Sequence, residues 1–495
     1  MASVQKDYPF SDYNVQQKLS QQELQFVEEF IAVINRTSKL SDFCEKYNQN
    51  QAMLKNFLDS LDVSKLNMPL PRKEKRLFEQ TLANALQVPN KFEIAEAVAN
   101  RVHGFVLIQP LFEDEELEEI IINGTSPVFV YHRTFNECKT NLSFTKNQLE
   151  VLLAQMEVNK EKSIHDLKLV DWHRANAILP PLVESPAITI RKFRAYPFSI
   201  IDLLNKNTIN AEAAAYLWAA VDGLQANPLN FLIIGGTSAG KTTTLNTLSA
   251  FIPPWERIVT IEDTPELNLF QKQNWVQTLS TDEYPMQELL TNVLRMRPDR
   301  IIVGDIRSGE AETLFTAMNT GHRGVMGTLH ANNAKDMAMR LENEPMNVPK
   351  SLIPLADFVV VQHRVNDRRK GLIRRVMQIS EVTKIEEGVI AMNDVFLYDF
   401  HSDTLERTKF QSAAVENLAN YSGKTINEVK DEVAHRAEIL ALLQQKGVRR
   451  FEDVNSFLWK YYEQYSMNSR QEPDAEEQTE RAPSENQGLG DTQIL

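Results

Sequence analysis

The sequence predicts an α/β fold for residues 228–398 and an α+β domain before it. Within 228–398, short apolar runs typical of strands alternate with helical segments, which is the pattern of a parallel sheet covered on both faces. A glycine-rich loop, Gly235–Thr242, joins the first of these strands to a helix. Upstream, Ala187–Phe193 alternates apolar and polar residues as a strand does. We therefore expect two folded domains of different class in one chain.

Composition narrows the class of protein. A chain of 495 residues with 42% hydrophobic residues is typical of a soluble protein with two or three domains. It contains no run near the roughly 18 apolar residues of a membrane span and no signal-peptide stretch at its start. We expect a cytoplasmic protein that is peripheral at the cytoplasmic membrane. Cys44 and Cys138 are too few for a zinc site of two Cys-x-x-Cys pairs, so we expect reduced thiols and no zinc.

Changes of pattern divide the chain into segments. The expected segments are a helical region at 1–90, an α+β domain at 91–205, a linking helix at 206–227, the α/β domain at 228–398, a helical subdomain at 399–465 and a disordered acidic tail at 466–495. We expect the acidic stretch Glu113–Glu119 to begin or occupy a helix. Thr425 and Glu428 form a capping box before a helix that reaches about Gln445. The tail has too few apolar side chains to offset the entropy of ordering.

The glycine-rich loop is the strongest functional signal. It reads GGTSAGKT and matches G-x-x-x-x-G-K-[ST] at every fixed position. Glycines let the backbone approach phosphates, and the N–H groups at the start of the next helix face the anion. We expect Lys241 to reach the β- and γ-phosphates of ATP and Thr242 to place its hydroxyl on Mg²⁺. The expected nucleotide-binding residues of the loop are Gly235, Thr237, Ser238, Ala239, Gly240, Lys241, Thr242 and Thr243.

Three later strands end in polar residues, namely Glu262, Asp305 and His330. Ligands of a parallel sheet bind beyond the carboxyl ends of its strands, so these side chains should meet the loop. Phosphoryl transfer needs one acid to order Mg²⁺ through water and one to orient or deprotonate the attacking water. We assign Asp305 to Mg²⁺ and Glu262 to the water. Each carboxylate could instead cap a helix or form a salt bridge.

Other titratable residues are weaker candidates. Glu266 and Glu310 are as consistent with structural roles as with catalysis. His322 and His330 are eight residues apart, which is not a common metal-ligand spacing, and no cysteine is near. A phosphate-sensing or structural histidine is the better interpretation.

Four motifs stand in a fixed order: GGTSAGKT, IEDTPEL, RMRPDRIIVGDIRSGEA and TGHRGVMGTLHAN. Together they resemble the ATPases of type II and type IV secretion systems and of type IV pilus assembly, over residues 228–380. IQPLFEDEELEEIIINGTSPVFVYHR and ITIRKF resemble that family's N-terminal domain, and MNVPKSLIPLADFVVVQHRV looks closest to its archaeal branch, which includes archaellum and archaeal pilus motors. The resemblance implies a RecA-like P-loop C-terminal domain, an N-terminal domain on a flexible linker, a homohexamer, and a polytopic platform protein of the inner (cytoplasmic) membrane as partner.

The resemblance also implies roles for single residues. It places Glu262, Asp263 and Glu266 in an aspartate box, and His322 and His330 in a histidine box. Arg174, Arg191 and Arg194 fall where the family closes over the phosphates, and in the sequence they lie far from any acidic run. The family's Walker B strand usually ends Gly-Glu, whereas this chain has Gly304-Asp305. The shorter Asp side chain draws its carboxylate back by about 1.5 Å, which could slow water activation or shift the base role to Glu262.

We therefore expect an ATP-hydrolysing hexameric motor for pilus-like filament assembly or type II/IV secretion. One alternative is a nucleotide-binding scaffold with weak turnover, for which Asp305 is the warning sign. Another is a DNA-handling secretion ATPase, as in conjugation. The net charge of −14 and the lack of a basic patch interleaved with aromatic residues weigh against direct nucleic-acid binding.

Overall fold

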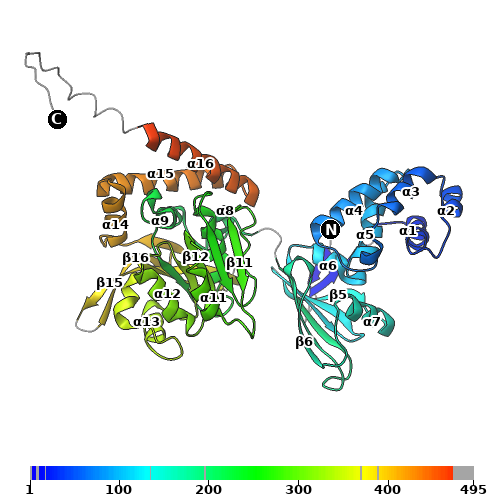
Figure 1. The fold of residues 1–495 in the computed structure, drawn as a ribbon, viewed down its shortest axis with the longest axis horizontal. Helices are drawn as coiled ribbons and strands as arrows, with labels where there is room; N and C mark the ends of the chain where they lie inside the picture. Colours follow the sequence, from blue (N-terminus) through cyan, green and yellow to red (C-terminus); the bar gives the residue numbers. More distant parts are fainter. Residues whose placement is uncertain are drawn as a thin grey trace, which may run out of the picture. The chain divides into compact units, whose positions relative to one another are not determined.

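The chain folds into two compact units, Met1–Ala195 and Tyr196–Leu495, which are described separately (Figure 1). The computed structural model describes residues 3–6, 11–16, 18–133, 135–193, 197–367, 371–386 and 389–471. Among these residues, no helix is both long enough and apolar enough to cross a membrane.

The first unit contains a helical part whose core combines aliphatic side chains with a cluster of phenylalanines. Its helices are α1 (Gln21–Ile34), α2 (Leu40–Tyr47), α3 (Gln51–Asp59), α4 (Arg72–Ala85) and α5 (Lys91–His103). A capping box of Ser20 and Glu23 begins α1. Phe26, Phe30 and Phe43 pack together with ring centroids 4.9–6.5 Å apart. Burial of these rings, together with that of the aliphatic residues of the same core, holds the short helices together.

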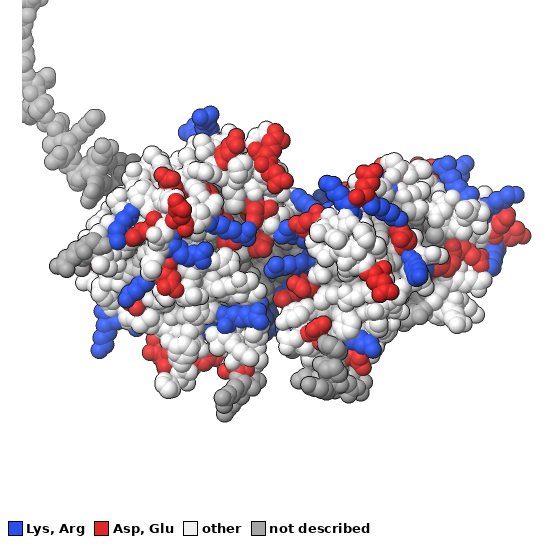
Figure 2. Space-filling model, turned by 90° about the horizontal axis from the view of Figure 1, so that it is seen from below, with Lys and Arg blue, Asp and Glu red and all other residues white. Residues whose placement is uncertain are grey.

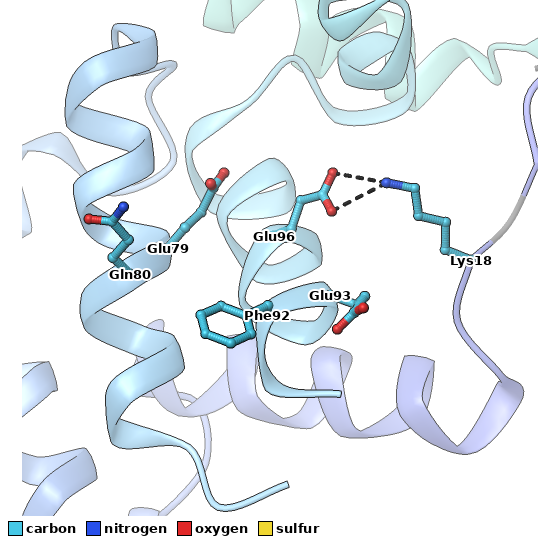
Figure 3. A pocket seen from close by; sticks show the side chains of 6 residues that line it. All are labelled: Lys18, Glu79, Gln80, Phe92, Glu93 and Glu96. Atoms are coloured by element: carbon cyan, nitrogen blue, oxygen red, sulfur yellow. Dashed lines mark hydrogen bonds and ion pairs between the residues drawn. The ribbon is translucent and has the colours of Figure 1, made fainter. Parts of the chain in front are cut away.

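A shallow pocket opens between α4 and α5 (Figure 3). Its lining residues are Lys18, Glu79, Gln80, Phe92, Glu93 and Glu96. Lys18 pairs with Glu96 at 3.3 Å on the exposed surface. Such a pair contributes little to stability.

The rest of the first unit is an eight-stranded sheet in the order β1-β2-β5-β4-β3-β8-β7-β6. The strands are β1 (Ser3–Lys6), β2 (Ser11–Asn14), β3 (Leu117–Asn123), β4 (Pro127–His132), β5 (Asn136–Ser143), β6 (Ile164–Lys168), β7 (Arg174–Ile178) and β8 (Ala187–Arg191). The helices are α6 (Gln109–Glu113) and α7 (Lys146–Gln155). Since β2 pairs in parallel with β5, the start of the region expected to be helical belongs instead to this sheet.

The prediction of a helix over Glu113–Glu119 is wrong. Helix α6 ends at Glu113, and strand β3 begins at Leu117. Strand β3 is paired on both sides, with β4 and with β8. Leu117, Ile120 and Ile122 are fully buried in that arrangement, so sheet pairing outweighs the helical preference of the glutamates.

The second unit is built on a nine-stranded sheet in the order β11-β10-β12-β13-β9-β14-β15-β16-β17. Its strands are β9 (Phe231–Ile234), β10 (Ile258–Glu262), β11 (Trp275–Leu279), β12 (Arg300–Ile306), β13 (Met326–Leu329), β14 (Phe358–Asp367), β15 (Gly371–Glu386), β16 (Val389–Asp399) and β17 (Thr404–Arg407). The pairs from β11 to β14 are parallel, and those from β14 to β17 are antiparallel. Since Ile234 lies opposite Leu329 and Ile261 opposite Val303, the carboxyl ends of four strands meet at one edge.

Helices cover both faces of this sheet, as the sequence predicts for a parallel arrangement. They are α8 (Ile200–Asn205), α9 (Ala211–Asp222), α10 (Lys241–Leu248), α11 (Met286–Val293), α12 (Glu310–Asn319), α13 (Ala334–Glu342), α14 (Ala413–Ser422), α15 (Ile426–Gln445) and α16 (Phe451–Gln471). One core joins the sheet to α8, α9, α10, α14 and α15, and a second core joins it to α11, α12 and α13. The α/β fold class is therefore confirmed.

The C-terminal part departs from the expected boundaries. Strand β17 continues the sheet to Arg407, past the expected limit at residue 398. Helix α15 begins at the predicted capping box of Thr425 and Glu428. Helix α16 extends to Gln471, and the remainder of the acidic tail lies outside the described residues.

Helix α16 is held by Tyr462, which is buried. The Tyr462 hydroxyl accepts a hydrogen bond from Trp218 Nε1 at 2.8 Å and donates to the carbonyl of Phe251 at 2.5 Å. Phe251 ends the short 3₁₀ helix η5 (Ser249–Phe251), which follows α10 without a break. The last described helix is therefore bonded to the segment that continues the phosphate-loop helix.

Charged side chains of both signs are interspersed on the face of each unit seen in Figure 2. The two cysteines are free and buried in different cores, Cys44 in the helical part and Cys138 in the first sheet. Within the described residues, no group of three or more His, Cys, Asp and Glu side chains is arranged to hold a metal ion.

Candidate nucleotide site

The glycine-rich loop connects strand β9 to helix α10 at the carboxyl edge of the second sheet. Ser238 and Gly240 have φ angles of 59° and 93°, in the left-handed region. A Cβ atom on Gly235 would lie 2.0 Å from the carbonyl oxygen of Gln362, so glycine is required where the loop passes β14. The loop is thus shaped by its own glycines and by the adjacent strand.

Two residues outside the motif hold the loop in place, and the sequence analysis missed both. Gln362 on β14 is buried; its Nε2 donates to Ala239 O at 2.9 Å and its Oε1 accepts from Thr244 Oγ1 at 2.7 Å. Arg374 on β15 donates from Nε to Ser238 O at 3.1 Å. No local signal marks these residues, because the register of β9, β14 and β15 alone brings them to the loop.

Lys241 lies across the loop. Its buried ammonium donates to Gly236 O at 3.2 Å, and His330 Nδ1 is 3.4 Å away. Burial lowers the pKa of Lys241, while the charges of Asp305 and Glu266 oppose that shift. Burial and the nearby Lys241 charge lower the pKa of His330, which favours a neutral ring that can accept a hydrogen bond. The structure thus brings Lys241 and His330 together as predicted from the strand ends.

Asp305 completes this cluster. His330 Nε2 lies 3.6 Å from Asp305 Oδ2, which also accepts from Arg307 Nε at 2.7 Å. The other oxygen, Oδ1, is shielded from solvent and has no hydrogen-bond partner within the described chain. A buried carboxylate oxygen without a partner is uncommon and energetically costly, so a ligand is the natural explanation for it.

Glu262 packs against Gly304, the residue before Asp305, and its carboxylate is engaged differently from that of Asp305. Its Oε1 accepts from the backbone N–H groups of Glu266 and Leu267, both at 2.8 Å, and its Oε2 accepts from Gln277 Nε2 at 2.8 Å. It is almost fully buried, and burial raises its pKa to about 7. In this conformation the carboxylate organises the turn that follows β10.

Two weaker candidates have structural surroundings. The buried Glu310 accepts from the backbone N–H groups of Arg307 and Ser308, and so holds the turn that precedes α12. His322 precedes β13 and lines a different pocket with Pro228, which precedes β9. That pocket therefore lies at the amino edge of the sheet, away from the loop, and His322 and His330 do not meet.

The N-terminal arginines lie on neighbouring strands. Arg174 and Arg191 are directly opposite each other in the β7–β8 register. No acidic run lies near these arginines in the sequence, but strand pairing still gives Arg174 a carboxylate partner, Asp166, at 3.0 Å. In the β3–β8 register, Glu119 is opposite Arg191. Arg194 lies outside the described residues.

A model of the family described as "Type II/IV secretion system protein" matches residues 108–436, most of the chain. The chain belongs to this family. The resemblance of the four motifs to a type II/IV secretion family is thereby confirmed.

Individual relatives differ in how much they share. Uncharacterized protein MJ0781 of Methanocaldococcus jannaschii is 41% identical over 237 residues, which cover 44% of this chain and 33% of that protein. The match thus spans about a third of this relative's own length. Conjugal transfer protein TrbB of Rhizobium radiobacter is 32% identical over 280 residues, covering 54% of this chain and 85% of TrbB. The solved structure of the pilus retraction motor PilT with bound ADP aligns at 18% identity and a TM-score of 0.43, covering 75% of this chain and 98% of PilT.

Proposed function

We propose that this family member is an ATP-hydrolysing homohexameric motor, peripheral at the cytoplasmic membrane. It would power assembly of a type IV pilus-like filament, or type II/IV secretion, through a polytopic platform protein of that membrane. The observation that carries the proposal is the meeting of Lys241, His330 and Asp305 at the phosphate loop. Membership of a family of secretion ATPases supports it.

The residues at the loop suit Mg²⁺ and a nucleotide. Asp305 offers a carboxylate oxygen without a partner and Thr242 a hydroxyl, and Mg²⁺ prefers oxygen ligands. Lys241 would exchange its bond to Gly236 O for phosphate oxygens, and the N-terminal N–H groups of α10 would face the same anion. When bound, Mg²⁺ would neutralise charge that develops on the phosphates.

Glu262 remains the proposed base. A pKa of about 7 is near the operating pH, which is where a general base works best. To accept a proton from water at Oε2, the carboxylate must release the Gln277 amide, while Glu266 and Leu267 N–H groups keep Oε1 in place. Arg174, Arg191 and Arg194 are proposed to complete the site on closure, because a guanidinium fork binds phosphate oxygens and stays charged.

Steady-state ATPase measurement tests this proposal and separates a motor from a scaffold. Lys241→Ala should abolish hydrolysis and leave the circular dichroism spectrum unchanged, because no other group of the loop places a mobile cation on the phosphates. Wild-type turnover in that variant would refute the assignment. For the ring, turnover per subunit should fall on dilution, in step with the mass measured by light scattering.

A DNA-handling role is the second candidate, favoured by the similarity to a conjugal transfer protein. Single-stranded DNA should then bind the wild-type chain with a strong dependence on salt and stimulate its turnover. If DNA neither binds nor stimulates turnover at low salt, this candidate is excluded.

A further inference from the structure

Arg307 bridges two carboxylates beside the phosphate loop. Its Nε donates to Asp305 Oδ2 at 2.7 Å, and its Nη1 donates to Asp263 Oδ2 at 2.6 Å. Its side chain is 60% exposed, against 17% for Asp305 and 35% for Asp263. The guanidinium therefore lies at the mouth of the site and is not packed into the core.

The backbone of Arg307 is fixed while its side chain is not. The carboxylate of the buried Glu310 accepts from the N–H groups of Arg307 and Ser308. Within the part of the chain that the structure describes, the ion pairs of the guanidinium are those with Asp263 and Asp305. The side chain can thus leave both carboxylates without disturbing the turn that carries it.

Without a cation between them, Asp263 and Asp305 would be neighbouring like charges. Arginine suits the bridging position, because its planar fork donates to two acceptors at once. The same carboxylates are oxygen donors of the kind that divalent cations take, and Asp305 Oδ1 lacks a partner. A guanidinium and a divalent cation therefore compete for one pair of acids.

We infer that Arg307 is an exchangeable counter-ion, which holds Asp263 and Asp305 in the nucleotide-free chain and gives them up when a divalent cation arrives with nucleotide. The inference rests on the proposed function, since it takes the loop to be a nucleotide site. The exchange makes the binding of metal and nucleotide cooperative. Metal alone must displace Arg307 into solvent, whereas metal with nucleotide gives the released guanidinium phosphate oxygens to face.

The experiment compares Mn²⁺ binding, read by electron paramagnetic resonance, in full-length nucleotide-free wild type, Arg307→Ala and Arg307→Lys. Arg307→Ala should bind Mn²⁺ roughly three- to fivefold more tightly, because the exposed ion pairs that compete with the metal are gone. Arg307→Lys should lie between, since an ammonium keeps the charge but not the fork. Arg295→Ala, another exposed arginine of the same unit, is the matched control and should bind as wild type does.

The second measurement is the effect of ADP on the affinity for Mn²⁺. ADP should tighten Mn²⁺ binding in the wild type by a larger factor than in Arg307→Ala, because the variant has no guanidinium to displace. Unchanged or weaker Mn²⁺ binding in both Arg307 variants, with wild-type melting curves, would overturn the inference. Failure of the proposed function looks different: the wild type would then neither hydrolyse ATP nor show ADP coupling, while the nucleotide-free comparison of Mn²⁺ affinities would still give its answer.

Discussion

The second unit contains two arginine–carboxylate clusters that differ in almost everything except their chemistry. Arg436 on α15 is fully buried; it pairs with Asp222 on α9 at 2.8 Å and with Glu432 at 2.8 Å, and lies over the ring of Trp218 at 4.8 Å. Burial works against the charge of Arg436, but Asp222 and its other neighbours keep its pKa above the ordinary range. Arg307 pairs with Asp263 and Asp305 at similar distances but is largely exposed.

The two clusters differ in whether every carboxylate oxygen has a hydrogen-bond partner. Both oxygens of Asp222 are occupied, because Oδ1 accepts from the Leu224 N–H at 3.0 Å and Oδ2 accepts from Arg436 Nη1 at 2.8 Å. Asp305 keeps one shielded oxygen without a partner. A closed network fixes helices against one another, whereas an incomplete one at the sheet edge is available to a ligand. Ion-pair distance alone would not separate the two.

Removing Arg436 from the buried cluster should give the largest change in the free energy of unfolding. Arg436→Ala leaves the Asp222 carboxylate buried without a compensating charge, and should lower the free energy of unfolding by about 3–5 kcal/mol. Guanidinium denaturation followed by tryptophan fluorescence measures it. The double variant Asp222→Asn/Arg436→Met should recover most of the loss, because neither of the two fully buried charges then remains. A loss below about 1 kcal/mol would contradict the contrast.

Glu262 tests the comparison more closely, because it is buried like Asp222 but lies in the candidate nucleotide site, as Asp305 does. Glu262→Gln should retain nucleotide binding and lose turnover by roughly 10²–10⁴, as expected for removal of a general base. Asp305→Glu, which restores the residue usual in the family, should not lower the rate. Glu283→Gln, at an exposed position of the same unit, is the control. If Asp305→Glu is inactive and Glu262→Gln is harmless, the two acids have been assigned the wrong way round.

The same residue predicts a pH dependence of stability. Burial raises the pKa of Glu262 from 4.5 to about 7, so between these values the folded chain holds a proton that the unfolded chain has released. Its contribution to folding stability therefore falls as pH rises from 4.5 to 7, and is constant above that. On going from pH 5 to pH 8, the unfolding free energy of Glu262→Gln should rise more, or fall less, than that of the wild type, because the variant lacks this loss. Equal differences would show that this carboxyl does not titrate in that window.

The smallest change in the free energy of unfolding is expected at the exposed cluster around Arg307. Arg307→Ala should change the free energy of unfolding by less than about 1 kcal/mol, because exposed pairs contribute little. The measurement is the denaturation used for Arg436→Ala. If Arg307→Ala lost as much unfolding free energy as Arg436→Ala, Arg307 would be a structural residue, and the two clusters would not differ in the way described.

The sequence predicts the parts of the site that local pattern encodes. Lys241 belongs to a contiguous motif, and Asp305 and His330 follow apolar strands whose order along the chain implies a common edge. Gln362 and Arg374 could not be found in this way, because they reach the loop through the register of three strands distant in sequence. Arg307 stood inside a recognised motif, yet only coordinates show its two partners.

The errors have a common physical origin. The glutamates before β3 favour a helix locally, but pairing with β4 and β8 decides their conformation. The acid nearest to Arg174 in the sequence is Asp171, yet Arg174 pairs with Asp166, which the β6–β7 hairpin brings to it. Sequence distance is thus a poor guide to charge environment inside a sheet, where neighbours come from other strands.

The bond between Tyr462 and Phe251 has a mechanical consequence. Helix α10 continues directly into η5, and η5 is bonded through the Phe251 carbonyl to α16. Trp218 contacts both residues of this bond: its ring stacks on Phe251 with centroids 5.0 Å apart, and its Nε1 donates to the Tyr462 hydroxyl. A displacement of the phosphate loop along the axis of α10 is therefore transmitted to α16 through η5 and the Phe251–Tyr462 hydrogen bond. The strands of the sheet are not part of this connection. Tyr462→Phe removes that linkage and keeps the ring that fills the space.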